Sequence, residues 1–124
     1  MSDKSRVLVV DDEPMNLRIL GEVLRNHCRV SVATCGPDAL EIARAQQPEL
    51  ILLDVMMPDM DGFEVCRRLK ADPATSGIPV VFITATAQPE GLARGLALGA
   101  AGFIAKPIDP SEIQARVRSL LGQP

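Results

Sequence analysis

The chain has 124 residues, a formal net charge of -3, 47% hydrophobic residues and 23% charged residues. This composition is typical of a soluble globular protein, and the length suits one domain, expected to span residues 1–124. With 16 acidic residues, 13 basic residues, three Phe and no Trp or Tyr, the sequence argues against nucleic-acid binding. No apolar run reaches the roughly 20 residues of a membrane span. The odd number of cysteines and the absence of a signal peptide predict a cytoplasmic protein.

Five short apolar runs alternate with five helix-like stretches. Three of these runs, V-L-V-V, L-I-L-L and V-V-F-I, do not alternate apolar with polar residues, which is typical of parallel strands covered on both faces. The order βαβαβαβαβα with right-handed crossovers predicts a doubly wound α/β fold with a five-stranded parallel sheet. The strands are expected at Arg6–Val10, Arg29–Ala33, Leu50–Leu53, Pro79–Ile83 and Ala101–Ala105.

The first helix is expected to begin at Pro14 and carries an apolar arc wider than a core-facing stripe requires. Asn16 lies near the centre of that arc, and we expect its side chain to turn inward and bond the surrounding loops. Met15 and Leu17 lie at opposite edges of the arc. Two interpretations remain open for this pair, which could belong to the margin of the core or could contact a docking protein.

The fourth helical segment is expected to be weaker than the others. It covers roughly residues 90–98 and contains Gly91 and Gly95, each of which costs about 1 kcal/mol relative to Ala in a helix interior. We therefore expect this helix to be mobile. The remaining helices have recognisable capping patterns, namely Gly36-Pro37 for the second, Asp61 with Glu64 for the third and Asp109-Pro110 for the fifth.

Ligands of doubly wound folds bind at the carboxyl ends of the strands, and this sequence concentrates polar residues there. Asp11 and Asp12 follow the first strand, and Asp54 ends the third. Thr84 ends the fourth strand, and Lys106 follows the fifth. Three carboxylates, one hydroxyl and one ammonium group are therefore expected at one edge of the sheet.

This set of groups restricts the chemistry of the site. Close carboxylates raise each other's pKa or require a cation, and an all-oxygen ligand set suits Mg²⁺. A magnesium ion beside a carboxylate, a hydroxyl and a lysine describes a phosphoryl-transfer site with an aspartyl-phosphate intermediate. Simpler roles remain open, because Asp11 or Asp12 could cap the first helix. Asp54 instead ends an apolar strand, where an acid without a partner is costly.

Four segments carry these residues: V-L-V-V-D-D-E-P, L-I-L-L-D-V-M-M-P-D-M-D-G, V-V-F-I-T-A and G-A-A-G-F-I-A-K-P. Together, at their spacing, they resemble the signature segments of the response-regulator receiver domain of two-component signal transduction, as found in chemotaxis regulators. The resemblance covers about residues 6–121. It implies a (βα)5 flavodoxin-like receiver fold with strand order 2-1-3-4-5.

Carried over residue by residue, the resemblance makes Asp54 the phosphorylation site. It implies that Asp12, Asp54 and the backbone carbonyl of Met56 bind Mg²⁺, or Mn²⁺ in its place. Asp11 would act on the metal directly or through water.

The resemblance also implies roles for residues around the phosphoryl group. Thr84 and Lys106 would bind it as catalytic residues, and the Lys106-Pro107 bond would be cis. Phe103 stands at the position of the family's switch aromatic, so Thr84 and Phe103 would switch a face formed by the fourth helix, fifth strand and fifth helix. A simpler reading keeps Phe103 as a core side chain.

The implied phosphodonor is a histidine kinase or a histidine phosphotransfer protein, and Met15 and Leu17 are candidate contacts for it. The output domain or target is unknown. Such a receiver catalyses its own phosphorylation and dephosphorylation but is no conventional enzyme. The alternatives are a magnesium-dependent phosphatase, although the D-x-D-x-T motif is missing after the first strand, a flavodoxin relative, and a scaffold that never carries phosphate.

Overall fold

The computed structural model of the chain describes residues 5–85 and 88–122. Strands and helices alternate along the chain, as the sequence predicts, and their boundaries lie within one or two residues of those expected. The elements are β1 (Ser5–Val10), α1 (Pro14–Leu24), β2 (Cys28–Ala33), α2 (Gly36–Gln46), β3 (Leu50–Asp54), α3 (Gly62–Ala71), β4 (Val80–Thr84), α4 (Pro89–Ala97), β5 (Gly102–Ala105) and α5 (Pro110–Leu121).

The five strands form one parallel sheet in the order β2-β1-β3-β4-β5. The predicted five-stranded, doubly wound fold and its strand order 2-1-3-4-5 are therefore confirmed. The order reverses beside β1, so the ends of β1 and β3 lie next to each other at the topological switch point. The register places Val10 opposite Leu53 and Asp54 opposite Ile83, which brings the carboxyl ends of β1, β3 and β4 to one edge.

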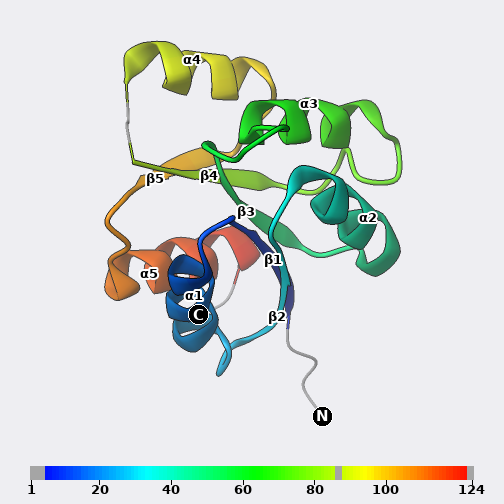
Figure 1. The fold of residues 1–124 in the computed structure, drawn as a ribbon. Helices are drawn as coiled ribbons and strands as arrows, with labels where there is room; N and C mark the ends of the chain where they lie inside the picture. Colours follow the sequence, from blue (N-terminus) through cyan, green and yellow to red (C-terminus); the bar gives the residue numbers. More distant parts are fainter. Residues whose placement is uncertain (1–4, 86–87, 123–124) are drawn as a thin grey trace.

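Helices cover both faces of the sheet, with α1 and α5 on one side and α2, α3 and α4 on the other (Figure 1). Every residue of β3 and β4 is buried, which explains why their sequences are apolar without alternation. Alternate residues of these strands point into two separate cores. The α1/α5 core includes Leu20, Leu24, Leu52, Val81, Ile83, Ile113 and Val117, and the opposite core includes Ala39, Ala43, Ile51, Leu53, Val65, Leu69 and Phe82.

Two of the predicted helix caps, at α3 and α5, are present as side-chain hydrogen bonds, whereas α2 begins at Gly36 with Pro37 in its first turn and no side-chain cap. The Asp61 carboxylate accepts a hydrogen bond from the Glu64 N–H, and Asp109 accepts one from the Ser111 N–H. These bonds satisfy amide groups that the first turn of a helix leaves without partners. Gly99 closes α4 with a φ of 99°, a left-handed conformation that favours glycine.

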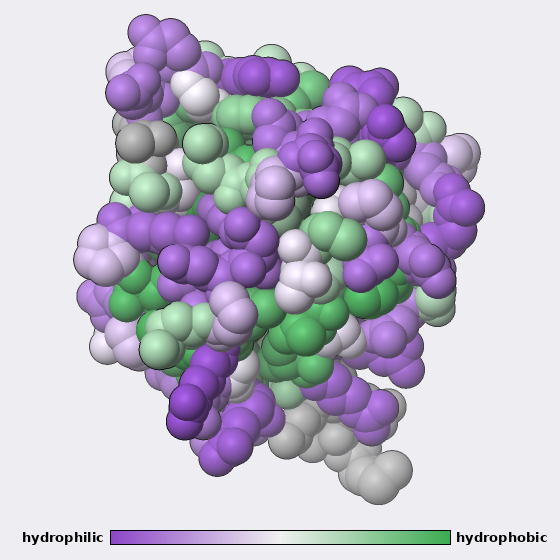
Figure 2. All heavy atoms as spheres, in the orientation of Figure 1, coloured by the Kyte–Doolittle hydropathy of each residue, from purple (hydrophilic) through white to green (hydrophobic). Residues whose placement is uncertain are grey.

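The surface mixes hydrophilic and hydrophobic residues. On the face seen in Figure 2, hydrophilic residues gather across the middle, over the region where Figure 1 places the loop after β1. Among the described residues, no helix combines the length and apolar character needed to cross a bilayer. Within residues 5–85 and 88–122, the large hydrophobic side chains that are well exposed are Met15, Val32, Met56 and Leu96.

Candidate functional site

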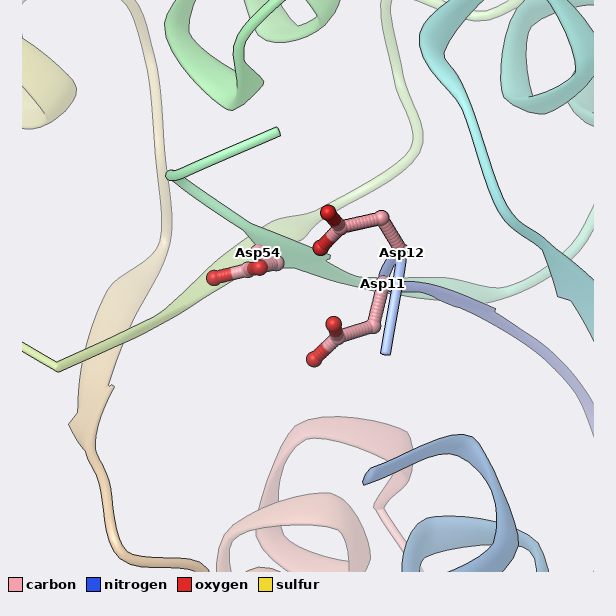
Figure 3. A group of neighbouring side chains, drawn as sticks. All are labelled: Asp11, Asp12 and Asp54. Carbon is pink, nitrogen blue, oxygen red and sulfur yellow. The ribbon is translucent and has the colours of Figure 1, made fainter. Parts of the chain in front are cut away.

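The strand ends bring three carboxylates together. Asp11 and Asp12 directly follow β1, and Asp54 is the last residue of the neighbouring strand β3. One carboxylate oxygen of each residue lies within 4.8 Å of the other two. Figure 3 shows the three carboxylates directed toward a common space at the edge of the sheet. The convergence predicted from the strand order is thus present.

Two of these acids are buried, and buried carboxylates normally have partners. Asp11 is 1% exposed and Asp54 is 3% exposed, whereas Asp12 lies at the surface. Lys106 reaches both buried acids, with its Nζ 3.2 Å from Asp54 Oδ1 and 3.4 Å from Asp11 Oδ2. The backbone N–H of Met56 also hydrogen-bonds to the Asp54 carboxylate. The two buried carboxylates therefore share one ammonium group.

The charges and the burial shift the pKa values of Asp54 and Lys106. Burial and the nearby charge of Asp11 raise the pKa of Asp54 to about 6, although Lys106 opposes this shift. Burial lowers the pKa of Lys106, but the charges of Asp54 and Asp11 outweigh it, so this pKa lies above its ordinary value. Lys106 therefore stays protonated at neutral pH, while Asp54 is held in its charged form only at a cost.

Thr84 and Lys106 come to the site from the far half of the sheet. Thr84, the last residue of β4, is 3% exposed, and its carbonyl accepts a hydrogen bond from the Lys106 N–H at 2.8 Å. The Lys106-Pro107 bond is cis, as the resemblance implied. Because β4 lies between β3 and β5, Thr84 stands between Asp54 and Lys106 along the edge of the sheet.

The donor set fits a hard divalent cation. Three carboxylate oxygens close together provide the all-oxygen ligands that Mg²⁺ prefers, and the exposure of Asp12 leaves one side open to water or phosphate. Two buried acids with one shared lysine leave excess negative charge, which a cation would balance.

Gly62 positions the Asp54 backbone, a role that the sequence reasoning missed. Gly62 is the first residue of α3, and its N–H donates to the Val55 carbonyl at 2.9 Å. A Cβ at Gly62 would lie 2.3 Å from the Asp54 carbonyl oxygen and 2.9 Å from the Val55 Cα. No side chain fits there without moving the end of β3. The local pattern indicates a helix cap at the adjacent Asp61, but it does not encode this contact across the loop.

The three phenylalanines of the chain form one aromatic cluster beneath α4. The Phe103 ring packs on Phe82, and Phe82 packs on Phe63, each pair with ring centroids 5.3 Å apart. The Arg94 guanidinium lies 4.5 Å from the centroid of the Phe63 ring. A Cβ at Gly95 would lie 2.4 Å from the Phe103 Cζ. Phe103 therefore packs against α4. From the sequence, Gly95 was expected only to weaken this helix, but in the structure it leaves room for the Phe103 ring.

The three residues singled out in the first turn of α1 differ in environment. Asn16 turns inward as expected, and its Nδ2 donates to Asp11 Oδ2 at 3.1 Å and to Glu13 Oε2 at 2.9 Å. Met15 is 62% exposed, whereas Leu17 is half-buried against the α1/α5 core. Of the two candidate docking residues, Met15 is the freer to contact another protein.

Comparison with known proteins identifies the family. The family model described as the response regulator receiver domain matches residues 7–118. The chain belongs to the response-regulator receiver domain family. This receiver is 51% identical over 117 residues to the response regulator PleD of Caulobacter vibrioides. The aligned residues cover 94% of the chain and 26% of PleD. It is 42% identical over 119 residues to the DNA-binding response regulator MtrA of Mycolicibacterium smegmatis, which covers 95% of the chain and 51% of MtrA.

Solved structures agree with this assignment. The receiver matches the Vibrio cholerae chemotaxis protein CheY4 with a TM-score of 0.90 at 28% identity, covering 94% of the receiver and 98% of CheY4. It matches the BeF3-activated receiver domain of DrrB with a TM-score of 0.85 at 31% identity, covering 97% and 99% of the two chains. The receiver spans about a quarter of PleD and about half of MtrA. Its family role is that of a phosphoacceptor in two-component signalling.

Proposed function

We propose that this receiver accepts the phosphoryl group on Asp54. The observation that carries the proposal is the position of this buried carboxylate, with Lys106 Nζ at 3.2 Å and oxygens of Asp11 and Asp12 within 4.8 Å. Asp11, Asp12, Asp54 and the backbone carbonyl of Met56 would hold Mg²⁺, or Mn²⁺ in its place. A bound divalent ion supplies positive charge next to the phosphoryl oxygens.

The proposed transfer moves a phosphoryl group from a phosphohistidine to the Asp54 carboxylate. A carboxylate oxygen forms a bond to phosphorus, and the phosphorus–nitrogen bond breaks with its electron pair passing to the imidazole, which takes up a proton. Lys106 pairs with one phosphoryl oxygen, and the Thr84 hydroxyl donates to another. The attack requires ionised Asp54, whose pKa without metal is raised to about 6. A bound divalent ion would lower this pKa, so the transfer rate should fall only at a pH below 6.

Thr84 and Phe103 would convert phosphorylation into a change at the α4-β5-α5 face. A hydrogen bond from Thr84 to the phosphoryl group would shift the end of β4. Phe82 lies on the same strand and stacks on Phe103 of β5, so the shift would reach the Phe103 ring. Phe103 has no hydroxyl, so its ring can respond only through its rotamer and burial. The contact between this ring and Gly95 would then bring the change to α4.

The wider assignments are part of the same proposal. Residues 1–124 would form a single receiver domain in the cytoplasm, phosphorylated by a histidine kinase or a histidine phosphotransfer protein. The receiver would turn over no separate metabolite and bind neither nucleic acid nor membrane itself. Its output domain or target is unassigned, since the relatives that it matches include a probable cyclic di-GMP phosphodiesterase of Vibrio cholerae and the DNA-binding MtrA.

Asp54→Asn tests the phosphorylation site. With acetyl phosphate and Mg²⁺, the wild-type protein should gain the mass of one phosphoryl group, and both EDTA and Asp54→Asn should abolish the gain. Intact-mass spectrometry measures this directly. Asp59→Asn, which removes an exposed acid from the loop between β3 and α3, is the control and should be phosphorylated like wild type. Phosphorylated Asp54→Asn would disprove the assignment, and turnover of small phosphate esters by wild type would favour the phosphatase alternative.

Met15→Glu tests the proposed docking surface. Because Met15 is 62% exposed, the change should leave folding intact, while a charge at a partner contact should slow phosphotransfer from a histidine phosphotransfer domain about tenfold. Phosphorylation by acetyl phosphate, which needs no docking, should be unchanged. Val32→Glu, at an exposed valine on edge strand β2, serves as the control. Transfer to Met15→Glu at the wild-type rate would remove Met15 from the docking surface, and Leu17→Glu then tests the other edge.

A further inference from the structure

The buried Asp11 carboxylate depends on three donors for its orientation. The Glu13 N–H donates to Asp11 Oδ1 at 2.9 Å. Asn16 Nδ2 donates to Oδ2 at 3.1 Å, and Lys106 Nζ lies 3.4 Å from the same oxygen. Lys106 is shared with Asp54, where its distance is shorter. Asn16 is therefore the side-chain donor, among these contacts, that serves Asp11 without also binding the phosphoacceptor.

The same amide of Asn16 also binds a fourth acid. Asn16 Nδ2 donates to Glu13 Oε2 at 2.9 Å, so one neutral NH₂ group stands between a buried carboxylate and an exposed one. An amide has two N–H donors, which matches these two acceptors. Without the amide, Asp11 and Glu13 would face each other as like charges, and Asp11 Oδ2 would keep only Lys106, which it shares with Asp54.

We infer that Asn16 is a positioning residue for the metal site, acting through Asp11. It holds the Asp11 carboxylate toward Asp12 and Asp54 and keeps Glu13 at the rim. This inference rests on the proposed function, because it concerns the same divalent ion. Groups that hydrogen-bond a metal ligand typically change metal affinity about ten- to a hundredfold when they are removed.

Asn16→Ala tests the inference through Mg²⁺ binding, measured by calorimetry without any phosphodonor. The variant should bind Mg²⁺ about tenfold or more weakly than wild type. Asn26→Ala makes the same substitution at an exposed asparagine beyond the far end of α1 and should bind like wild type. Glu13→Gln keeps the backbone donor and the Asn16 contact to Asp11, so its affinity should change no more than two- to threefold. Equal affinity of Asn16→Ala and wild type would overturn the inference.

Two further measurements separate positioning from a general loss of structure. At saturating Mg²⁺, Asn16→Ala should be phosphorylated by acetyl phosphate at a rate close to wild type, which a misfolded site would not allow. In wild type, NMR signals of the Asn16 side-chain amide should shift during a Mg²⁺ titration, and those of Asn26 should not. An Asn16 amide that ignores Mg²⁺ would overturn the inference even if Asn16→Ala failed to fold. Wild-type protein that binds no Mg²⁺ would overturn the metal proposal as well.

Discussion

In the absence of divalent ions, Asp54→Asn should stabilise the protein at neutral pH. Burial and the charge of Asp11 make ionised Asp54 unfavourable in the folded state, and Lys106 compensates only in part. Asparagine has the shape of the protonated acid and keeps an oxygen that can accept from Lys106. The substitution that we propose will abolish phosphorylation is therefore expected to increase the free energy of unfolding.

The pH dependence of this effect has a defined sign. The pKa of Asp54 is raised from 3.8 to about 6 on folding, so the folded protein binds a proton more tightly than the unfolded chain does. The stability contributed by Asp54 is therefore fully present below pH 3.8 and is lost as the pH rises toward 6. A shift of this size corresponds to at most about 3 kcal/mol. The difference between variant and wild type should be near zero in acid and reach its plateau above pH 6.

Urea denaturation in EDTA at a series of pH values measures the difference. Glu22→Gln removes an exposed acid from α1, far from the site, and should give a small difference at every pH. Mg²⁺ should narrow the gap between Asp54→Asn and wild type, because a ligand of the folded state stabilises only the protein that binds it. An Asp54→Asn variant less stable than wild type at pH 7 in EDTA would show that the Asp11–Asp54 repulsion is already compensated.

The fold could be predicted from the sequence because the strand patterns and the helix caps indicated the same architecture. Uninterrupted apolar runs required a sheet buried on both faces, and proline and acidic caps marked the helix starts. The position of the site followed from the same pattern, since parallel strands place their carboxyl ends at one edge. Asp54 was conspicuous as an acid at the end of an apolar strand, where burial makes an ionised group costly.

Contacts between distant residues could not be read in this way. Gly62 looked like an ordinary position after a helix cap, but its missing side chain leaves room for the Asp54 carbonyl. Gly95 looked like a defect in α4, but it makes room for the Phe103 ring. At both positions separate segments approach so closely that an added Cβ would lie less than 3 Å from a neighbouring atom, and neither helical periodicity nor local propensity encodes such an approach. The inward turn of Asn16 was predictable because the apolar arc around it showed which face of α1 is buried.

The two glycines of α4 should respond oppositely to the same substitution. A Cβ at Gly91 would lie 3.8 Å from the Phe63 Cζ, an ordinary contact, so Gly91→Ala should stabilise the protein by up to about 1 kcal/mol through helix propensity. A Cβ at Gly95 would lie 2.4 Å from Phe103 and 3.1 Å from Phe82. Overpacking of this kind costs about 1–3 kcal/mol, so Gly95→Ala should destabilise the protein despite the same gain in propensity.

The cause of the Gly95 effect can be tested in a second background. In a Phe103→Ala protein the ring that blocks position 95 is gone, so Gly95→Ala should become neutral or stabilising, as Gly91→Ala is in wild type. Free energies of unfolding from urea denaturation give the coupling between residues 95 and 103 as a double-mutant cycle. If Gly95→Ala costs the same with and without the Phe103 ring, α4 does not rest on that ring. The ring would then have no direct route to α4, and the proposed switch would have to act through β5 and α5.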